Sequence, residues 1–255
     1  MITPNIASHL TVMALQQPDT HAVVVQSISA SDKSDLILYK NTYTYKELDE
    51  ISNMIANGLR NYGIAKGMRT VLMVKPGLDF FALIFALFKL EAVLVAVDPG
   101  MGIKNLGKCL AEAESEAFIG ISSAHIARLT LGWAKKTISK TVLVGNNLLL
   151  ARTITTLEKI KASAKDRIFE NKKTVAEDMA AILFTSGSTG IPKGVVYTHA
   201  NFTAQHEALK NLYNIQKGEI DLATFPLFAL FAPALGMTSV IPKMDFTRPG
   251  HVNPK

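Results

Sequence analysis

The chain has 255 residues, of which 48% are hydrophobic, and its formal net charge at pH 7 is +6. These values describe an ordinary globular protein, long enough to bury a sizeable core in one large domain or two smaller ones. Its single cysteine, Cys109, excludes an intramolecular disulfide, and the N-terminus lacks the charged and apolar regions of a signal peptide, so we expect a cytoplasmic protein.

The positive net charge alone does not indicate a nucleic-acid partner. The densest group of lysines, between residues 159 and 173, alternates with acidic residues. Such alternation is typical of a solvated face rather than of a track for phosphates. We therefore expect no nucleic-acid partner. A peripheral binder of nucleic acid or of an anionic membrane stays open as the weakest alternative.

The first helix that the sequence predicts covers Tyr45 to Tyr62, where apolar residues recur at helical spacing and Gly63 follows as a C-cap. The apolar run Thr70–Val74 then predicts a fully buried strand. The most apolar stretch, Leu78 to Val97, is about as long as a membrane span but carries Lys89 and Glu91 near its middle. We interpret it as a buried helix, Phe80–Leu90, and a buried strand, Val93–Val97, with no transmembrane segment.

The pattern of helices and strands continues toward the middle of the chain. A helix is expected near Lys104–Glu114, and strands are expected at Ala117–Ile121 and Thr141–Gly145. Strands that are apolar on both faces and separated by helices indicate an α/β fold with mostly parallel sheets and helices on both sides. The stretch Asn147–Glu177 shows no clear period and is a possible boundary between two lobes.

The sequence AAILFTSGSTGIPKGVVYTHAN, Ala180 to Asn201, is the most informative part of the chain. We predict strands at residues 181–185 and 194–198, followed by a helix that Thr198 or Asn201 caps and that ends near Tyr213. Between the strands stand hydroxyls, glycines, a proline and Lys193. Such a loop offers hydroxyl and backbone N–H donors with little steric bulk, and the lysine adds a charge suited to phosphate.

Two other phosphate or acyl-transfer motifs do not fit this loop. A Walker A loop requires a second glycine five positions after its first, followed directly by lysine. Pro192 stands five positions after Gly187, and Val195 stands five positions after Gly190, so neither glycine begins such a motif. A nucleophile elbow requires glycine two positions before its serine, and Ser186 occupies that place before Ser188. A hairpin loop of chance composition is the remaining alternative. The residue types favour a site that holds a flexible polyphosphate.

The stretch Thr185–Gly194, TSGSTGIPKG, resembles the phosphate-binding signature of the AMP-forming adenylating enzymes, which include acyl-CoA synthetases, luciferases and peptide-synthetase adenylation domains. Residues 42–73 and 80–100 resemble the family's early helix–strand pairs, so the resemblance covers nearly the whole chain. It implies that ATP is the cofactor, together with Mg²⁺ and in some branches CoA. It also implies that a carboxylate attacks the α-phosphate, and that the acyl group then passes to a thiol or another nucleophile.

The resemblance assigns roles to the residues of the loop. Four hydroxyl residues would donate hydrogen bonds to the β- and γ-phosphates, two glycines would give the loop mobility, and a lysine would neutralise phosphate charge as the one tentative catalytic residue. The hydroxyl residues are Thr185, Ser186, Ser188 and Thr189, the glycines are Gly187 and Gly190, and the lysine is Lys193. Positioning and charge stabilisation would carry the adenylation step.

The sequence departs from the family's usual pattern after the loop. Many members carry a histidine where this chain has Ala229, and the surrounding segment resembles the branch with fatty-acid CoA ligases and olefin β-lactone synthetases. That branch implies a fatty acid, with a β-hydroxyl group where a lactone is formed. Phe225, Phe228 and Phe231 are equally interpretable as core or as part of an acyl pocket. Chain length, acyl acceptor and oligomeric state cannot be derived from the sequence.

The resemblance also implies segments that residues 1–255 do not contain. The family's adenine- and Mg²⁺-binding run, its ribose-binding aspartate and the lysine of its C-terminal domain have no match here. We therefore expect an incomplete N-terminal adenylation domain that cannot complete adenylation alone, with no metal ligand in this chain. The alternative is a short paralogue without catalysis that binds a nucleotide or forms oligomers.

Single residues outside the loop have mostly structural interpretations. His199 is expected to make a hydrogen bond at the start of its helix rather than to approach the nucleotide, and His206 is expected at the surface. The six histidines show no spacing typical of metal ligands. Cys109 is interpreted as a partly buried apolar residue, and Trp133 as core.

Overall fold

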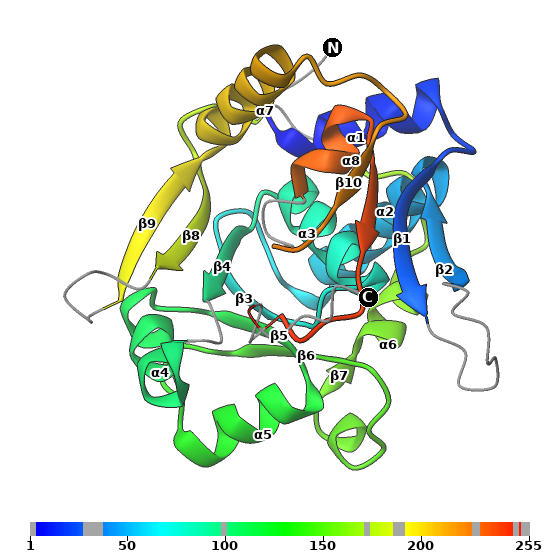
Figure 1. Cartoon of the computed structure of the whole chain (residues 1–255). Coiled ribbons are helices and arrows are strands. Elements are labelled where there is room, and N and C mark those ends of the chain that lie inside the picture. Colours follow the sequence, from blue (N-terminus) through cyan, green and yellow to red (C-terminus); the bar gives the residue numbers. More distant parts are fainter. Residues whose placement is uncertain are drawn as a thin grey trace.

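A computed structural model describes residues 4–27, 38–97, 101–170, 174–185, 192–225, 230–246 and 250. Two sheets and the helices around them make up the molecule (Figure 1). The helices are α1 (Ile6–Gln16), α2 (Tyr45–Tyr62), α3 (Leu78–Leu90), α4 (Ile103–Glu112), α5 (Ser122–Leu131), the short 3₁₀ helix η2 (Leu150–Arg152), α6 (Leu157–Ser163), α7 (His199–Tyr213) and α8 (Phe231–Leu235). The strands are β1 (His21–Ser27), β2 (Leu38–Thr44), β3 (Arg69–Met73), β4 (Val93–Val97), β5 (Ala117–Ile121), β6 (Lys140–Val144), β7 (Thr155–Thr156), β8 (Met179–Thr185), β9 (Lys193–Thr198), β10 (Ile220–Leu222) and β11 (Thr238–Ile241).

The larger sheet has seven strands in the order β7-β6-β5-β3-β4-β8-β9. All of its pairs are parallel except β8 with β9, which is antiparallel. One face of this sheet packs with α2, α3 and α6 in a large apolar core, and the other face packs α4 and Trp133 in a second core. This arrangement confirms the predicted α/β class with mostly parallel strands and helices on both faces.

The smaller sheet, in the order β10-β11-β1-β2, was not predicted. Strand β1 pairs in parallel with β11 and antiparallel with β2, so the N-terminal region and the region near residue 240 lie side by side. Strand β10 has only three residues. No local period marks strands this short, and the pairing of β1 with β11 joins segments from opposite ends of the chain.

Helix α2 shows how the local sequence fixes an element. The hydroxyl of Thr44 accepts from the backbone N–H of Glu47, and the Glu47 carboxylate accepts from the N–H of Thr44, which is a complete capping box. Gly63 ends the helix with φ of 96°, a conformation that favours glycine, as predicted. Inside the helix, a Cβ on Gly58 would lie 2.1 Å from the backbone oxygen of Ile160, so glycine permits the close approach of α6.

The apolar stretch 78–97 forms α3 and β4, as predicted. Its charged residue Lys89 is buried, and its Nζ donates to Asp49 Oδ1 at 2.8 Å, to Ser52 Oγ at 2.7 Å and to Asn53 Oδ1 at 2.7 Å. Burial lowers the pKa of Lys89, and the Asp49 carboxylate opposes that shift. Among the described residues no helix is both long and apolar enough to cross a membrane.

Most other predicted elements lie within two residues of their observed bounds, as the ends of α4, β3 and β6 show. The stretch 147–177 contains η2, β7 and α6, and the division into lobes there stays a prediction. Cys109 and Trp133 are buried, and burial raises the pKa of the Cys109 thiol. This burial confirms the interpretation of Trp133 as core, whereas Cys109, which was expected to be partly buried, is only 1% exposed.

Candidate active site

The hydroxyl-rich sequence connects β8 and β9, the hairpin at one side of the larger sheet. Thr185, the last residue of β8, is the direct partner of Lys193, the first residue of β9. Buried Ala181, Ile182 and Phe184 fix β8 in the sheet. The residues between the two strand ends must therefore leave and return at one point of the sheet edge.

That edge is where an α/β sheet most often binds its ligands. Strands β3, β4 and β8 are parallel, so their carboxyl ends lie at the same edge of the sheet. The chain leaves β3 toward α3 on one face and leaves β4 toward α4 on the other, so β3 and β4 flank a topological switch point. Ligands of open α/β sheets bind outside the carboxyl ends of the strands at such a point.

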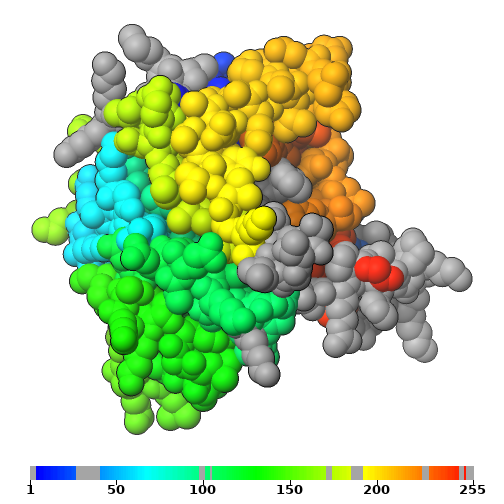
Figure 2. Space-filling model, turned by 90° about the vertical axis from the view of Figure 1, so that its left-hand side faces the viewer, coloured from blue at the N-terminus to red at the C-terminus, as the bar shows by residue number. Residues whose placement is uncertain are grey.

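Two lysines lie at this edge of the sheet. Lys193 is exposed at the start of β9, and Lys75 is exposed two residues after β3. Within the described ranges neither side chain is in an ion pair with an acidic residue. Figure 2 shows β9 and α7, in yellow, on the face above the green α4. The edge therefore offers positive charge that could balance that of an anionic ligand.

The predicted loop residues are only partly within the described structure. Thr185 and Lys193 are placed together at the base of the hairpin. The other predicted binding residues, Ser186, Gly187, Ser188, Thr189 and Gly190, lie outside the described residues. Pro192, immediately before Lys193, is buried. The roles assigned to these residues stay predictions.

His199 is separated from the loop by the whole of β9. Because β9 is antiparallel to β8, its end at Thr198 pairs with Met179 at the start of β8, at the opposite edge of the sheet. The predicted hydrogen bond of the His199 ring at the helix start is wrong. Thr198 and Asn201 form the capping box of α7, whereas the His199 ring is buried and has no hydrogen-bond partner among the described residues. Burial lowers the pKa of His199.

The prediction of a surface position for His206 is also wrong. Only 3% of His206 is exposed, because it packs against His9 of α1, with ring centroids 3.9 Å apart, and against α8. Burial, and secondarily the neighbouring His206, lower the pKa of His9 to about 4. Glu207 completes a group of three possible metal ligands. Sequence spacing gave no signal of this group, because His9 and His206 stand near opposite ends of the chain.

A second candidate region is an apolar hollow of about 290 Å³ beside α7, α8 and β10. Phe225 and Phe231 line it; Phe231 is buried, but 53% of Phe225 is exposed. Phe225 is therefore not an ordinary core residue. Phe228 and Ala229 lie outside the described residues. An apolar hollow of this size is at the lower end of the range for small-molecule sites.

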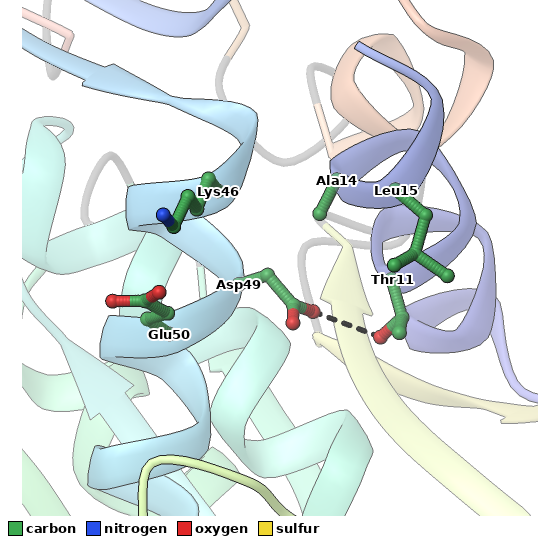
Figure 3. Close-up of a pocket in the computed structure, with 6 residues that line it drawn as sticks. All are labelled: Thr11, Ala14, Leu15, Lys46, Asp49 and Glu50. Atoms are coloured by element: carbon green, nitrogen blue, oxygen red, sulfur yellow. Dashed lines mark hydrogen bonds between the residues drawn. The ribbon is translucent and has the colours of Figure 1, made fainter. Parts of the chain in front are cut away.

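A further hollow of about 250 Å³ lies between α1 and α2 (Figure 3). Its acidic residue Asp49 accepts a hydrogen bond from the Thr11 hydroxyl at 2.8 Å and also binds Lys89. These polar groups satisfy one another and hold α1, α2 and α3 together. We assign this hollow a structural role.

Comparison with known proteins identifies the family. The sequence pattern described as "AMP-binding enzyme" matches residues 12–243. The olefin beta-lactone synthetase of Stenotrophomonas maltophilia is 48% identical over 251 residues, which are 98% of this chain and 45% of that protein. The long-chain-fatty-acid–CoA ligase FadD13 of Mycobacterium tuberculosis is 26% identical over 80% of this chain and 41% of its own length. The chain thus spans less than half the length of these relatives.

Solved structures agree on the fold. The N-terminal domain of FACL13 from Mycobacterium tuberculosis superposes with a TM-score of 0.75 at 22% sequence identity. The match covers 96% of this chain and 58% of that one. At this identity the likeness shows the fold alone, which is that of the N-terminal domain of an acyl-CoA ligase.

Proposed function

Because this chain belongs to the AMP-binding enzyme family, we propose that it contributes the phosphate-binding part of an ATP-dependent acid-activating ligase. A carboxylate oxygen of the substrate acid attacks the α-phosphorus of ATP. The bond between that phosphorus and the pyrophosphate oxygen breaks, and an acyl-adenylate and pyrophosphate result. One observation carries the proposal: the direct pairing of Thr185 with Lys193 closes a hydroxyl-rich loop at the carboxyl edge of the parallel strands.

The residues of this loop would act by positioning and by charge. Hydroxyl and amide groups of residues 185–190 would donate hydrogen bonds to the β- and γ-phosphates, and Lys193 would balance the charge of the departing pyrophosphate. Strands β8 and β9 hold both ends of the loop, so its donors would stay close to the carboxyl edge of the sheet. Mg²⁺ would supply further positive charge at the phosphates, and its protein ligand is expected outside this chain.

We propose a fatty acid, with a β-hydroxyl group, as the substrate. The stronger similarity is to an enzyme called olefin beta-lactone synthetase rather than to a fatty-acid–CoA ligase. In the lactone route the substrate's own hydroxyl oxygen attacks the acyl carbon, the hydroxyl proton is lost, and AMP leaves. In the CoA route the thiol of CoA is the nucleophile. The apolar hollow at Phe225 and Phe231 is a candidate surface for part of the acyl chain.

The test is acid-dependent exchange of labelled pyrophosphate into ATP. An immunoblot of the source cells first gives the length of the native polypeptide, and exchange is then measured on the protein of that length. We expect long-chain β-hydroxy acids to drive exchange more strongly than amino acids or short acids. Failure of every acid to drive exchange would contradict ligase activity.

A role without catalysis is the competing function. A native band at the 27.7 kDa of this chain, together with ATP binding but no exchange, would favour a short paralogue that binds a nucleotide. A band about twice as large, as the 45% coverage of a relative suggests, would favour the ligase. Product analysis with purified β-hydroxy acid, with and without CoA, separates the lactone route from the CoA route.

A further inference from the structure

Helices α1 and α7 bring two histidines and a carboxylate into one cluster that the proposed function does not use. His9 and His206 lie ring against ring, and the Glu207 carboxylate oxygen lies 3.1 Å from Nδ1 of His206. One nitrogen or oxygen atom of each residue lies within 4.8 Å of the others. The two rings are almost completely buried, whereas 56% of the Glu207 side chain is exposed.

The hydrogen bonds of His206 leave a mismatch at Nδ1. Its Nε2 lies 3.2 Å from the carbonyl oxygen of Ala234, and because a carbonyl can only accept, Nε2 carries the proton. In the neutral ring Nδ1 is then an acceptor, and it faces a carboxylate oxygen that is also an acceptor. Two acceptors at 3.1 Å repel each other unless a cation lies between them, either a proton on Nδ1 or a metal ion.

His9 favours the metal ion over the proton. A proton on Nδ1 would satisfy His206 and Glu207 but would leave the buried ring of His9 against an imidazolium. Only 8% of His9 is exposed, its ring packs against the ring of His206, and burial favours the neutral form of an imidazole. A neutral ring has a free lone pair. A single metal ion would use the lone pairs of both rings and the charge of the carboxylate.

We propose that His9, His206 and Glu207 bind one Zn²⁺ ion. Two imidazole nitrogens and one carboxylate oxygen form a ligand set that zinc commonly takes, with water in the fourth position. The hydrogen bond from Nε2 of His206 to Ala234 is the second-shell contact that fixes a zinc-binding ring. Tetrahedral zinc ligands lie about 3.3 Å apart, given bonds of about 2.0–2.1 Å. Rotation of the His9 ring and movement of the exposed Glu207 side chain would supply the remaining adjustment, while Ala234 holds the His206 ring.

The site would join three helices that are distant in the sequence. His9 belongs to α1, His206 and Glu207 to α7, and the supporting carbonyl of Ala234 to α8 (Figure 1). Zinc that binds only the folded chain would therefore stabilise the packing of α1 against α7. The ammonium of Lys210 is the nearby positive charge that opposes a cation at this site.

The test is zinc binding to the untagged 255-residue chain after treatment with a chelator. Calorimetry is expected to show one Zn²⁺ per chain, and Co²⁺ is expected to give the visible spectrum of a tetrahedral site. Glu207→Gln should weaken binding at least tenfold, and it leaves the fold intact because the side chain is exposed. His9→Gln and His206→Gln should abolish binding. His21→Gln, which changes an exposed histidine outside the cluster, is the matched control.

Several results would overturn the zinc site. One is the absence of a stoichiometric Zn²⁺ complex; another is binding that Glu207→Gln leaves unchanged. Nitrogen NMR would also contradict the zinc site if it showed that, in the presence of Zn²⁺, His206 is an imidazolium paired with Glu207.

Two lysine variants refine the test. Lys210→Gln should strengthen zinc binding a few fold, because it removes the nearby positive charge. Lys193→Ala should not change it, because Lys193 and α7 are at opposite ends of β9, so failure of this site leaves the phosphate-loop proposal unaffected.

Discussion

The unit of α3 and β4 and the hairpin of β8 and β9 belong to the same sheet but differ in what surrounds them. Every residue of α3 from Phe81 to Leu90 is buried, and β4 lies between β3 and β8. Strand β9 is at the side of the sheet, and 51% of Val196 is exposed. The first region is held by packing on all sides. The second is held in the sheet through β8 and carries exposed residues, among them Lys193 and Val196.

This difference means that the residues that stabilise the fold and the residues that would bind the ligand lie in different parts of the sheet. Substitutions in α3 should change the free energy of unfolding, whereas substitutions at the exposed end of the hairpin, such as Lys193, should change ligand binding with little effect on stability. The following predictions test that separation, from the largest expected effect to the smallest.

Phe85→Ala should destabilise the protein by about 3–5 kcal/mol, because the ring is fully buried and its removal leaves a cavity in the larger core. Urea unfolding followed by circular dichroism measures the change. Phe225→Ala, at a ring that is about half exposed, is the control and should cost much less. Equal losses of stability in the two variants would contradict the claim that α3 is held by buried packing and the half-exposed Phe225 is not.

Lys89→Met should cost about 3–5 kcal/mol, because it removes the partner of Asp49 and leaves polar groups unpaired in a buried network. Asp49→Leu in the same chain should recover part of that loss, since both charges are then absent. A double-mutant cycle from urea unfolding gives the coupling energy. Additive effects of the two substitutions would show that the pair is not coupled.

Gly58→Ala should destabilise the protein by about 1–3 kcal/mol, although alanine is the better helix former. The added Cβ would lie 2.1 Å from the backbone oxygen of Ile160, so α2 and α6 would have to separate. Ile160→Ala should not rescue the variant, because the atom in conflict is backbone. Thermal unfolding of the single and double variants tests this. If Ile160→Ala restored the stability of Gly58→Ala, the added Cβ would instead be colliding with the Ile160 side chain.

Val196→Thr should change the unfolding free energy by no more than about 0.5 kcal/mol, because this residue is about half exposed on the last strand of the sheet. Val95→Thr, at a fully buried position in β4, is the matched substitution and should be clearly destabilising. Parallel urea titrations compare them. A large effect at Val196 would mean that β9 is as tightly held as β4.

The sequence predicted the regular α/β part of the molecule well, since its signals are local. The apolar stripe, capping box and Gly63 of α2 all lie within one segment, and β4 is a short apolar run between turn residues. The smaller sheet could not be predicted, because β1 pairs with β11 at the other end of the chain. The cluster of His9 and His206 was missed for the same reason. The hydrogen bond expected of His199 at the start of its helix was wrong, because Thr198 and Asn201 cap α7 and the buried His199 ring has no hydrogen-bond partner among the described residues.

The phosphate loop is the central claim, and Lys193 tests it most directly. The measurement is acid-dependent pyrophosphate exchange of Lys193→Ala and Thr189→Ala in the native-length protein, with exposed Lys136→Ala as the control and unfolding free energies determined in parallel. We predict a loss of more than tenfold, about 1.4 kcal/mol or more of transition-state stabilisation, in the two loop variants alone, with stability unchanged. Exchange at the wild-type rate in both loop variants would contradict the assignment.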